Sequence, residues 1–214
     1  MSQLSKILRR ASVYIPTVIG EEYGGGYFAG YMRADSQRYA LVVAKKADGE
    51  YPSRVSLLKA AVGSAGASMW NGRANTEEMY ALLASGSAAD AIRFCYELTI
   101  GGYTDWAVPA TQQADLLYRA FKPGDTDNST QSDTANPYAD PATGPYTASS
   151  PSVTTLANFK DGGSEAFQTL AQYWTSTNNF TLYRRLFTTG AIGGGGPPGD
   201  PYYVRAVRMV KIPG

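Results

Sequence analysis

The longest segment without helical or strand periodicity runs from Gly124 to about residue 165 and begins with the sequence GDTDNSTQSDTANPYADPATGPYTASSPSVTT. Pro, Gly, Ser, Thr, Asn and Asp dominate it, and each of these residues favours turns for a steric or hydrogen-bonding reason. A loop of this length inside a compact domain is usually functional or disordered. Its four prolines and its Asn and Asp residues favour an ordered meander. Any fold for this chain must therefore hold a long irregular segment on a regular scaffold.

Strands are predicted on both sides of that segment. GGGYFAGYM (24–32) and YALVVAKK (39–46) are aromatic and β-branched runs on either side of the polar RADSQR, which predicts a β-hairpin. Towards the C-terminus, QYWTST (172–177) and TLYRRLF (181–187) flank a short polar turn at Asn178 and Asn179. YYVRAVRMV (202–210) predicts a final strand, and the glycine- and proline-rich residues 193–201 before it predict a wide turn.

Three helices are predicted between the hairpin and the irregular segment. Asn75, Ser87 and Thr111 are expected to cap their N-termini, because such side chains accept hydrogen bonds from the first backbone N–H groups. Cys95 falls within the apolar stripe of the second helix, which favours a small buried hydrophobe over a reactive thiol. Strands followed by helices and then by strands predict an α+β fold.

Composition excludes several classes of protein. Of the 214 residues, 43% are hydrophobic, which is enough for a proper core. A net charge of +1 lacks the basic footprint of a nucleic-acid-binding protein, so no nucleic-acid partner is expected. The absence of histidine removes the commonest general base and zinc ligand. A single cysteine cannot form an internal disulfide. Because no long apolar run follows the basic residues near the N-terminus, we expect no signal peptide and no membrane insertion.

Residues 1–23 are expected to form an N-terminal arm, and residues 24–214 the folded domain. The motif LSKILRR (4–10) allows one or two helical turns, too few to be stable alone in water. It is either a frayed terminus or a docking peptide that becomes ordered against a partner. The candidate attachment residues are Leu4, Ile7, Leu8, Arg9 and Arg10.

Acidic residues in the irregular region suggest two kinds of chemistry, and neither is preferred. DTDNSTQSD (125–133) resembles a calcium loop only at its first positions and lacks the later Gly and Glu, so a solvated turn is favoured and no metal is predicted. Asp133, Asp140, Asp161 and Glu165 could supply the two carboxylates of a glycosidase. They lie in loop-like sequence without apolar surroundings to raise one pKa, so no catalytic residue and no cofactor are predicted.

The segment GGYTDWAVPA (101–110) joins the second predicted helix to the third. Trp106 stands between two helices, which favours burial over a role as an exposed ligand platform. Asp105 follows a glycine turn, where its carboxylate could accept backbone N–H groups or pair with Arg205 or Arg208 of the last strand. Both alternatives remain open at this point.

An ordered set of motifs resembles a known family. WNGRANTEEM, GGYTDWAVPA, YRAFKP, NPYADPATGPYT, YWTST and YVRAVR follow one another as in the DUF1566, or Lcl-C-terminal-like, domains of bacteriophage tail-fibre and other virion proteins. The similarity covers roughly residues 24–212. It implies a C-type-lectin-like fold with mixed or antiparallel twisted sheets, two to three helices and long surface loops. The calcium–sugar triplets of true C-type lectins and the cysteine pair of formylglycine-generating enzymes are absent, so neither activity is implied.

The resemblance implies a non-enzymatic virion protein, made in the host cytoplasm, that acts as a tail-fibre, tail-tip or appendage component in host-surface recognition. Its expected partners are other virion proteins, bound through the arm, and a host surface glycan or protein, and we expect a homo-oligomer. Long loops would present the ligand-binding residues. The candidates are Tyr138, Tyr146, Asn178, Asn179 and Asp200. Two alternatives remain, a capsid or collar decoration protein with a purely structural role and a surface-polysaccharide depolymerase.

Overall fold

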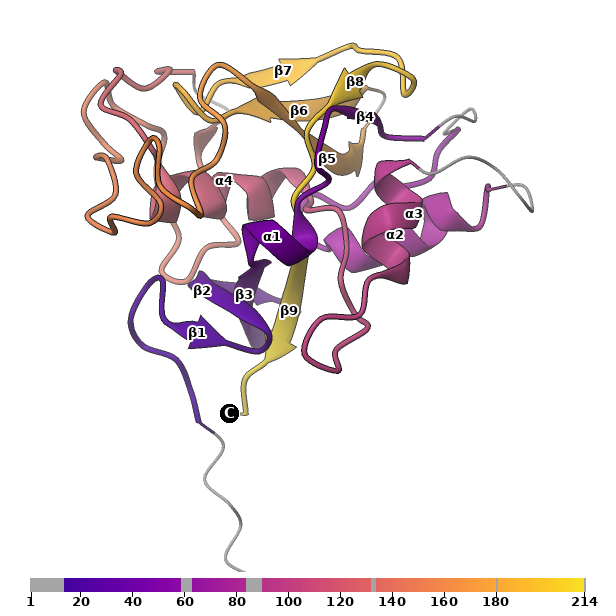
Figure 1. The fold of residues 1–214 in the computed structure, drawn as a ribbon, viewed down its shortest axis with the longest axis horizontal. Coiled ribbons are helices and arrows are strands. Elements are labelled where there is room, and N and C mark those ends of the chain that lie inside the picture. Colours follow the sequence, from indigo (N-terminus) through magenta and orange to yellow (C-terminus); the bar gives the residue numbers. More distant parts are fainter. Residues whose placement is uncertain (1–13, 59–62, 84–89, 132–133, 180, 214) are drawn as a thin grey trace, which may run out of the picture.

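Antiparallel sheets with helices between and beside them give the protein a mixed α+β fold (Figure 1). The structure, a computed structural model, describes residues 14–58, 63–83, 90–131, 134–179 and 181–213. The strands are β1 (Glu22–Tyr23), β2 (Gly26–Ala34), β3 (Gln37–Ala44), β4 (Val55–Ser56), β5 (Gln172–Asn178), β6 (Leu182–Leu186), β7 (Ile192–Gly194), β8 (Pro201–Tyr202) and β9 (Val207–Lys211). The helices are α1 (Lys46–Gly49), α2 (Gly72–Tyr80), α3 (Ala91–Glu97) and α4 (Thr111–Phe121).

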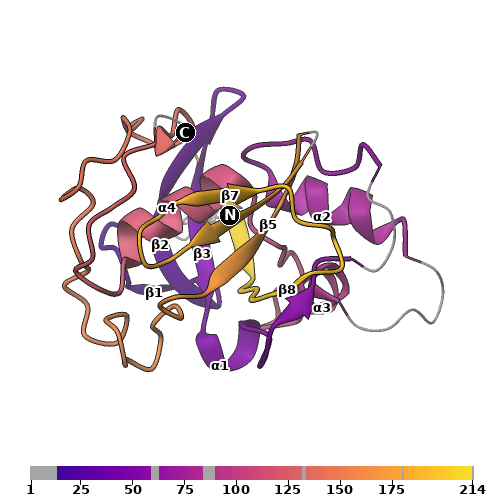
Figure 2. The same cartoon turned by 90° about the horizontal axis from the view of Figure 1, so that it is seen from above.

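The strands form two sheets and one short ribbon within the described ranges. One sheet has the strand order β1-β2-β3-β9, and the other has the order β5-β6-β7. β4 and β8 pair separately as a two-stranded ribbon. α4 lies between the two sheets, with the four-stranded sheet on one side and β5–β7 on the other (Figures 1 and 2).

β2 and β3 confirm the predicted hairpin, and each strand lies two residues closer to the turn than predicted. Ala34 pairs with Gln37, so only Asp35 and Ser36 remain in the turn. Both turn residues have positive φ, 50° and 60°, as a two-residue type I′ turn requires. The twist of this turn matches the twist of the two strands, which lets pairing continue through RADSQR.

A bulge in β2 brings the hairpin close to α4. The register between β2 and β3 shifts between Phe28 and Gly30. Gly30 has a φ of +131°, and a Cβ at this position would lie 3.2 Å from a methyl carbon of Leu116. Glycine therefore meets two needs here, because it adopts this backbone conformation and leaves room for the helix.

The predicted strand over residues 202–210 consists of two strands that belong to different pairings. β8 pairs with β4, whereas β9 pairs with β3 and closes the four-stranded sheet. Between them, Tyr203 N donates to Gln172 O at 3.0 Å, and the buried Arg205 donates from Nη1 to Glu165 O at 2.7 Å. Strand propensity is alike on both sides of this switch, so the sequence pattern did not reveal it.

The predicted turn over residues 193–201 also contains a strand. β7 includes Gly193 and Gly194 and pairs with β6. Asn178, predicted to lie in the turn between β5 and β6, is instead the last residue of β5 and pairs with Leu182. Tertiary pairing with a neighbouring strand overrides the low strand propensity of glycine at this edge.

The first predicted helix begins earlier than expected. Its N-cap is Asn71, whose Oδ1 accepts from Ala74 N at 3.0 Å. Asn75, predicted to be the cap, lies inside α2 and binds the preceding loop instead. Its Oδ1 accepts from Ser68 N at 2.9 Å, and its Nδ2 donates to Ser68 O at 2.7 Å. Two asparagines four residues apart offered the same local signal, and only the contacts of the loop separate their roles.

The N-cap residues of the other two helices also differ from those predicted. Asp90 is the N-cap of α3, and Ser87 lies outside the described residues. Thr111 is the first residue of α4, which follows Ala110, and Ala110 N donates to Gln113 Oε1 at 2.8 Å. No helix in the described ranges combines the length and the apolar character that crossing a bilayer demands.

Two tryptophans lie at the centre of one hydrophobic cluster together with Cys95. Trp106 and Trp174 are fully buried, and their indole N–H groups donate to Tyr103 O at 3.1 Å and Val55 O at 2.9 Å. The predicted burial of Trp106 and Cys95 is confirmed. A buried indole needs a partner for its N–H, and each tryptophan finds one on the backbone.

The described residues between 124 and 170 form an ordered meander beside α4 (Figures 1 and 2). Asn136 and Thr143 form an isolated antiparallel bridge. The side chain of Asn128 is buried and donates from Nδ2 to the carbonyl oxygens of Thr147 and Pro151, both at 2.9 Å. The predicted order of this segment is confirmed, and buried side-chain amides supply part of the hydrogen bonding that regular strands would provide.

Candidate ligand-binding site

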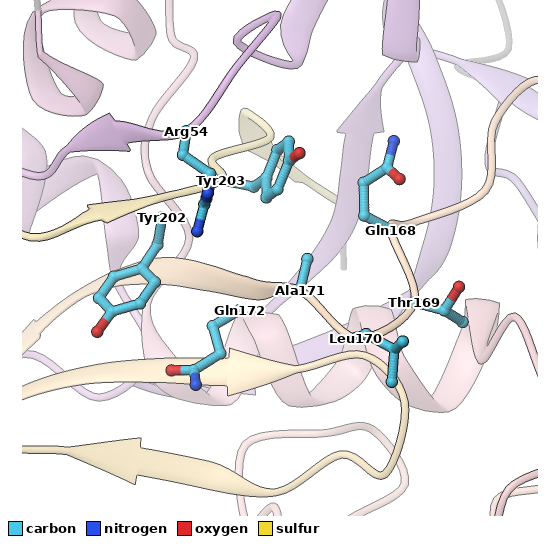
Figure 3. Close-up of a pocket in the computed structure, with 8 residues that line it drawn as sticks. All are labelled: Arg54, Gln168, Thr169, Leu170, Ala171, Gln172, Tyr202 and Tyr203. Atoms are coloured by element: carbon cyan, nitrogen blue, oxygen red, sulfur yellow. The ribbon is translucent and has the colours of Figure 1, made fainter.

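A cavity of about 340 Å³ opens where the start of β5 meets β8 and the residue that precedes β4. This volume lies in the range of small-ligand sites, ~300–1,000 Å³. Figure 3 shows Arg54 and two tyrosines on one side of the cavity and the segment 168–172 on the other. The lining residues are Arg54, Gln168, Thr169, Leu170, Ala171, Gln172, Tyr202 and Tyr203.

Regular strand pairing positions the walls of this pocket. Val55 of β4 pairs with Tyr202 of β8, which places Arg54 opposite Tyr203. Tyr203 in turn bonds through its backbone to Gln172 at the start of β5. Three segments that are distant in the sequence therefore meet through backbone hydrogen bonds, so the pocket is formed before any ligand arrives.

The two tyrosine rings of the pocket rest on other aromatic rings. Tyr202 packs edge-on against Trp174 with ring centroids 4.8 Å apart, and the guanidinium of Arg184 lies 4.9 Å from the Tyr202 ring centre. Tyr203 lies 5.6 Å from Tyr173. Both tyrosines are half-buried. Tyrosines held in this way offer contact area and a hydroxyl group with little loss of conformational freedom.

Gln172 and Gln168 add amide groups to the pocket. The Oε1 atom of Gln172 accepts a hydrogen bond from Nε of Arg184, and no partner for its NH₂ group lies among the described residues. Gln168 has an exposed side chain, while its backbone N–H donates to Tyr173 Oη at 2.9 Å. Each amide can therefore donate to a ligand that carries hydroxyl or carboxylate oxygens.

Leu170 lies at the rim of the pocket with an exposed apolar side chain and an energetically unfavourable backbone conformation. Its side chain is 87% exposed, and its φ is +62°. A left-handed backbone costs an L-residue other than Gly or Asn roughly 1–2 kcal/mol. Its backbone N–H donates to Thr188 Oγ1 at 2.8 Å, which holds the conformation. Backbone strain of this kind clusters at ligand-binding sites, which favours a role for Leu170 at the rim.

A buried group of charged and phenolic side chains lies behind the pocket wall. Tyr173 Oη donates to Glu50 Oε2 at 3.2 Å, and the fully buried Arg205 donates from Nη2 to Glu165 Oε2. Burial raises the pKa of Glu50 above its ordinary value, although Arg205 and Lys46 oppose that shift. Glu50 and Arg205 also form an isolated antiparallel bridge, so these contacts link β5 to the chain around Glu165, just before Gln168.

Tyr146 belongs to the scaffold, which corrects its prediction as a ligand-binding residue. It is 3% exposed, and its hydroxyl donates to Asp115 Oδ1 and accepts from Arg185 Nη1 at 3.0 Å. Burial raises the pKa of Tyr146. The place of Tyr146 in a long loop suggested an exposed ring. Instead, its hydroxyl donates to the buried Asp115 of α4, whose carboxylate needs hydrogen-bond donors.

The other predicted ligand-binding residues lie outside the pocket. Tyr138 is half-buried and stacks on Trp70 with ring centroids 6.2 Å apart. Asn178 donates from Nδ2 to a loop carbonyl, Gly63 O, at 2.8 Å, and Asn179 is exposed. Asp200 accepts from Tyr202 Oη at 3.3 Å, so it approaches the pocket through that hydroxyl.

The candidate attachment residues Leu4, Ile7, Leu8, Arg9 and Arg10 lie outside the described residues. The described residues begin at Tyr14, and several apolar side chains at this end of the chain are exposed to solvent. Tyr14, Ile15, Val18 and Ile19 are all exposed.

The carboxylates considered for glycosidase chemistry have other partners. Asp140 pairs with Arg38 at 2.8 Å, and Glu165 pairs with the buried Arg205. Asp161 accepts from Thr169 Oγ1 at 2.9 Å, and Asp133 lies outside the described residues. Across the part of the chain that the structure describes, no three Cys, Asp or Glu side chains gather as a metal site would require.

Sequence reasoning missed the residues that form the pocket. One signal for them was present in the pair Tyr202-Tyr203. Successive strand residues point to opposite faces, so at least one ring of such a pair can reach a surface. Arg54, Gln168 and Gln172 carried no comparable signal, because only the β4–β8 pairing brings them together.

The chain was compared with protein-family models, with curated proteins and with solved structures, and none of the three comparisons found a match.

Proposed function

We propose that this chain is a non-enzymatic bacteriophage virion protein whose C-type-lectin-like domain binds a host-surface glycan in the pocket beside β5 and β8. The observation that carries the proposal is the convergence of two tyrosine rings, two glutamine amides and an arginine around one preformed cavity. The virion assignment rests only on the resemblance of the sequence motifs to DUF1566 domains, since the comparison with family models found no match. The α+β architecture with a long ordered meander agrees with the lectin-like fold that this similarity implies.

The chemistry of the pocket fits recognition. Amides and phenolic hydroxyls exchange hydrogen bonds with sugar hydroxyl groups, and aromatic rings cover the apolar C–H surface of a sugar. Leu170 extends the apolar contact at the rim. In this proposal the arm of residues 1–23 attaches the domain to other virion proteins, and a homo-oligomer presents several pockets to the host surface, which strengthens weak single-site binding.

A competition assay tests the recognition function. Excess purified protein, added to host cells before infection, should lower phage adsorption by occupying the receptor. The double variant Gln168→Ala/Leu170→Asn should compete poorly, because it removes an amide and the apolar rim. Leu82→Asn is the matched control, since Leu82 is also exposed (43%) but does not line the pocket. Equal competition by all three proteins would contradict a binding role for the pocket.

A capsid or collar decoration protein is the second candidate function. The observation that favours it is the exposed apolar run Tyr14, Ile15, Val18 and Ile19, which would be buried in an assembled particle. Particles that lack the protein separate the two functions. Unstable or incomplete particles that still adsorb normally would support decoration, whereas intact particles that fail to adsorb would support recognition.

Depolymerase activity is the third candidate and rests on the acidic residues alone. Asp140 and Glu165 are engaged with arginines, which leaves neither carboxylate positioned as a free acid or base. Incubation of the protein with surface polysaccharide, followed by chain-length analysis, tests this function. Shortening of the chains that disappears in Asp140→Asn would favour the depolymerase over a binding protein.

A further inference from the structure

We infer that the pocket selects a saccharide that carries an anionic group, a carboxylate or a phosphate, and that Arg54 binds this group. The inference rests on the proposed function and narrows it to one class of glycan. It follows from how the charged residues of the protein are distributed among ion pairs.

The arginines of the described residues divide into two groups. Eight of them form ion pairs with a carboxylate, at Arg33, Arg38, Arg73, Arg93, Arg119, Arg185, Arg205 and Arg208. The two without a carboxylate partner among the described residues are Arg54 and Arg184, and both lie at or next to this one pocket. Arg54 lines it, and Arg184 contacts two of its lining residues, Gln172 and Tyr202.

Among the described residues, no acidic side chain lines the cavity, and Arg54 is the one charged residue that does. Two described carboxylates approach from outside the lining, Asp200 through Tyr202 Oη at 3.3 Å and Asp161 through Thr169 Oγ1 at 2.9 Å. Neither forms an ion pair with Arg54 or Arg184. Arg54 therefore offers an unpaired positive charge at the cavity surface, which attracts an anionic ligand group.

The side chain of Arg54 is available to a ligand, whereas contacts with Gln172 and Tyr202 hold the side chain of Arg184. Arg54 is exposed and precedes β4, where its guanidinium can present a planar pair of N–H groups to a carboxylate or phosphate. Arg184 donates from Nε to Gln172 Oε1 and lies over the ring of Tyr202, and its buried Nη1 has no hydrogen-bond partner among the described residues. Arg184 therefore acts as a positioning residue that adds a fixed positive charge behind the pocket wall.

The remaining lining residues favour a saccharide over an acidic peptide. Two tyrosine rings and two amides surround the arginine in a cavity of about 340 Å³, a size that suits one or two sugar units. Sugar hydroxyls have both donor and acceptor character, which the amides of Gln168 and Gln172 can satisfy together.

The test uses the full chain and a panel of polymers in a binding assay. The anionic members are polygalacturonate, alginate, hyaluronan, polysialic acid and a phosphate-bearing teichoic acid, and the neutral members are dextran and mannan. Carboxyl-reduced polygalacturonate and hyaluronan are matched neutral controls, and poly-glutamate represents an acidic peptide. The variants are Arg54→Gln and the control Arg33→Gln, which removes an equal charge from an exposed side chain (55%) outside the pocket.

We expect binding to at least one anionic polysaccharide, with loss on carboxyl reduction if the anion is a carboxylate. Binding to teichoic acid alone would identify phosphate. Arg54→Gln should weaken binding about tenfold or more, the usual loss for a hydrogen bond to a charged group. Arg33→Gln should leave binding unchanged, and both variants should melt at the wild-type temperature.

Three outcomes would overturn the inference. Equal binding to anionic and neutral polymers, with no effect of Arg54→Gln, would remove the anionic class and leave a general glycan-binding function intact. Binding to poly-glutamate without binding to any polysaccharide would replace the saccharide with a peptide. Binding to no member of the panel would count against both the inference and the proposed glycan recognition.

Discussion

Arg208 binds both carboxylate oxygens of Asp105, with Nε at 2.7 Å from Oδ1 and Nη2 at 3.0 Å from Oδ2. The same guanidinium donates from Nη1 to Gly24 O at 2.9 Å and lies 3.8 Å from the ring centre of Tyr103. One side chain of β9 thus joins the start of the N-terminal sheet to the glycine turn before Trp106. Of the alternatives that the sequence left open for Asp105, the structure selects the ion pair with Arg208.

Replacing Asp105 with alanine should destabilise the fold by about 1–2 kcal/mol. A hydrogen-bonded charge pair is worth roughly 1.5–3 kcal/mol, and solvent reduces this value because Asp105 is 45% exposed. Urea unfolding followed by tryptophan fluorescence measures the change. Unchanged stability together with lost ligand binding would show that Asp105 belongs to a site and not to the joint.

Replacing Tyr146 with phenylalanine should lower stability and leave ligand binding intact. The change removes the hydroxyl that donates to the buried Asp115, and an unsatisfied buried acceptor costs about 1–3 kcal/mol. Thermal unfolding and the polymer-binding assay measure the two properties separately. A stable variant with weakened binding would return Tyr146 to the recognition surface.

Replacing Leu170 with asparagine should raise stability and weaken binding. Asparagine tolerates the left-handed backbone, so the variant relieves a strain of roughly 1–2 kcal/mol at the φ of +62°. The same change removes the exposed apolar side chain from the rim of the pocket. The expected opposite shifts of melting temperature and affinity distinguish a binding residue from a residue with no role, for which only the stability would change.

Glu50 should make stability fall as the pH rises above its ordinary pKa of 4.5, because burial raises the pKa of this carboxyl in the folded protein. The native state then binds the Glu50 proton more tightly than the unfolded state. The stabilisation from that proton is complete below pH 4.5 and is lost as the pH rises through the raised native pKa.

Glu50→Gln tests this linkage, since glutamine keeps an acceptor for Tyr173 Oη and carries no charge. The variant should be more stable than the wild type at neutral pH, and the difference should vanish under acidic conditions. Unfolding curves across the pH range measure it. A variant that is less stable than the wild type at neutral pH would mean that ionised Glu50 is stabilising.

Cys95 should be unreactive in the native protein and fully reactive after unfolding. The thiol is buried, and burial raises its pKa well above the ordinary value, so little nucleophilic thiolate forms. Iodoacetamide labelling with and without urea, read by mass spectrometry, measures this contrast. Rapid labelling of the native protein would contradict the assignment of Cys95 to the core.

Local signals in the sequence were sufficient for several elements of this protein. Alternating aromatic and β-branched residues predict the β2–β3 hairpin and the β5–β6 pair, because pattern and strand propensity agree there. Apolar periodicity places Cys95 in the core. Turn-forming residues predict an ordered meander, and its buried amides confirm it.

Tertiary structure alone decided where strands change partners and which polar residues meet. The switch from β8 to β9, the strand pairing of β7 and the choice of Asn71 over Asn75 as the cap depend on neighbours that are distant in the sequence. The same holds for the pocket, where Arg54, Gln172 and Tyr203 come together through backbone pairing. The periodicity of a sequence shows which face of a helix or strand is apolar. A binding site depends instead on which elements lie side by side, and the packing of the whole core determines that arrangement.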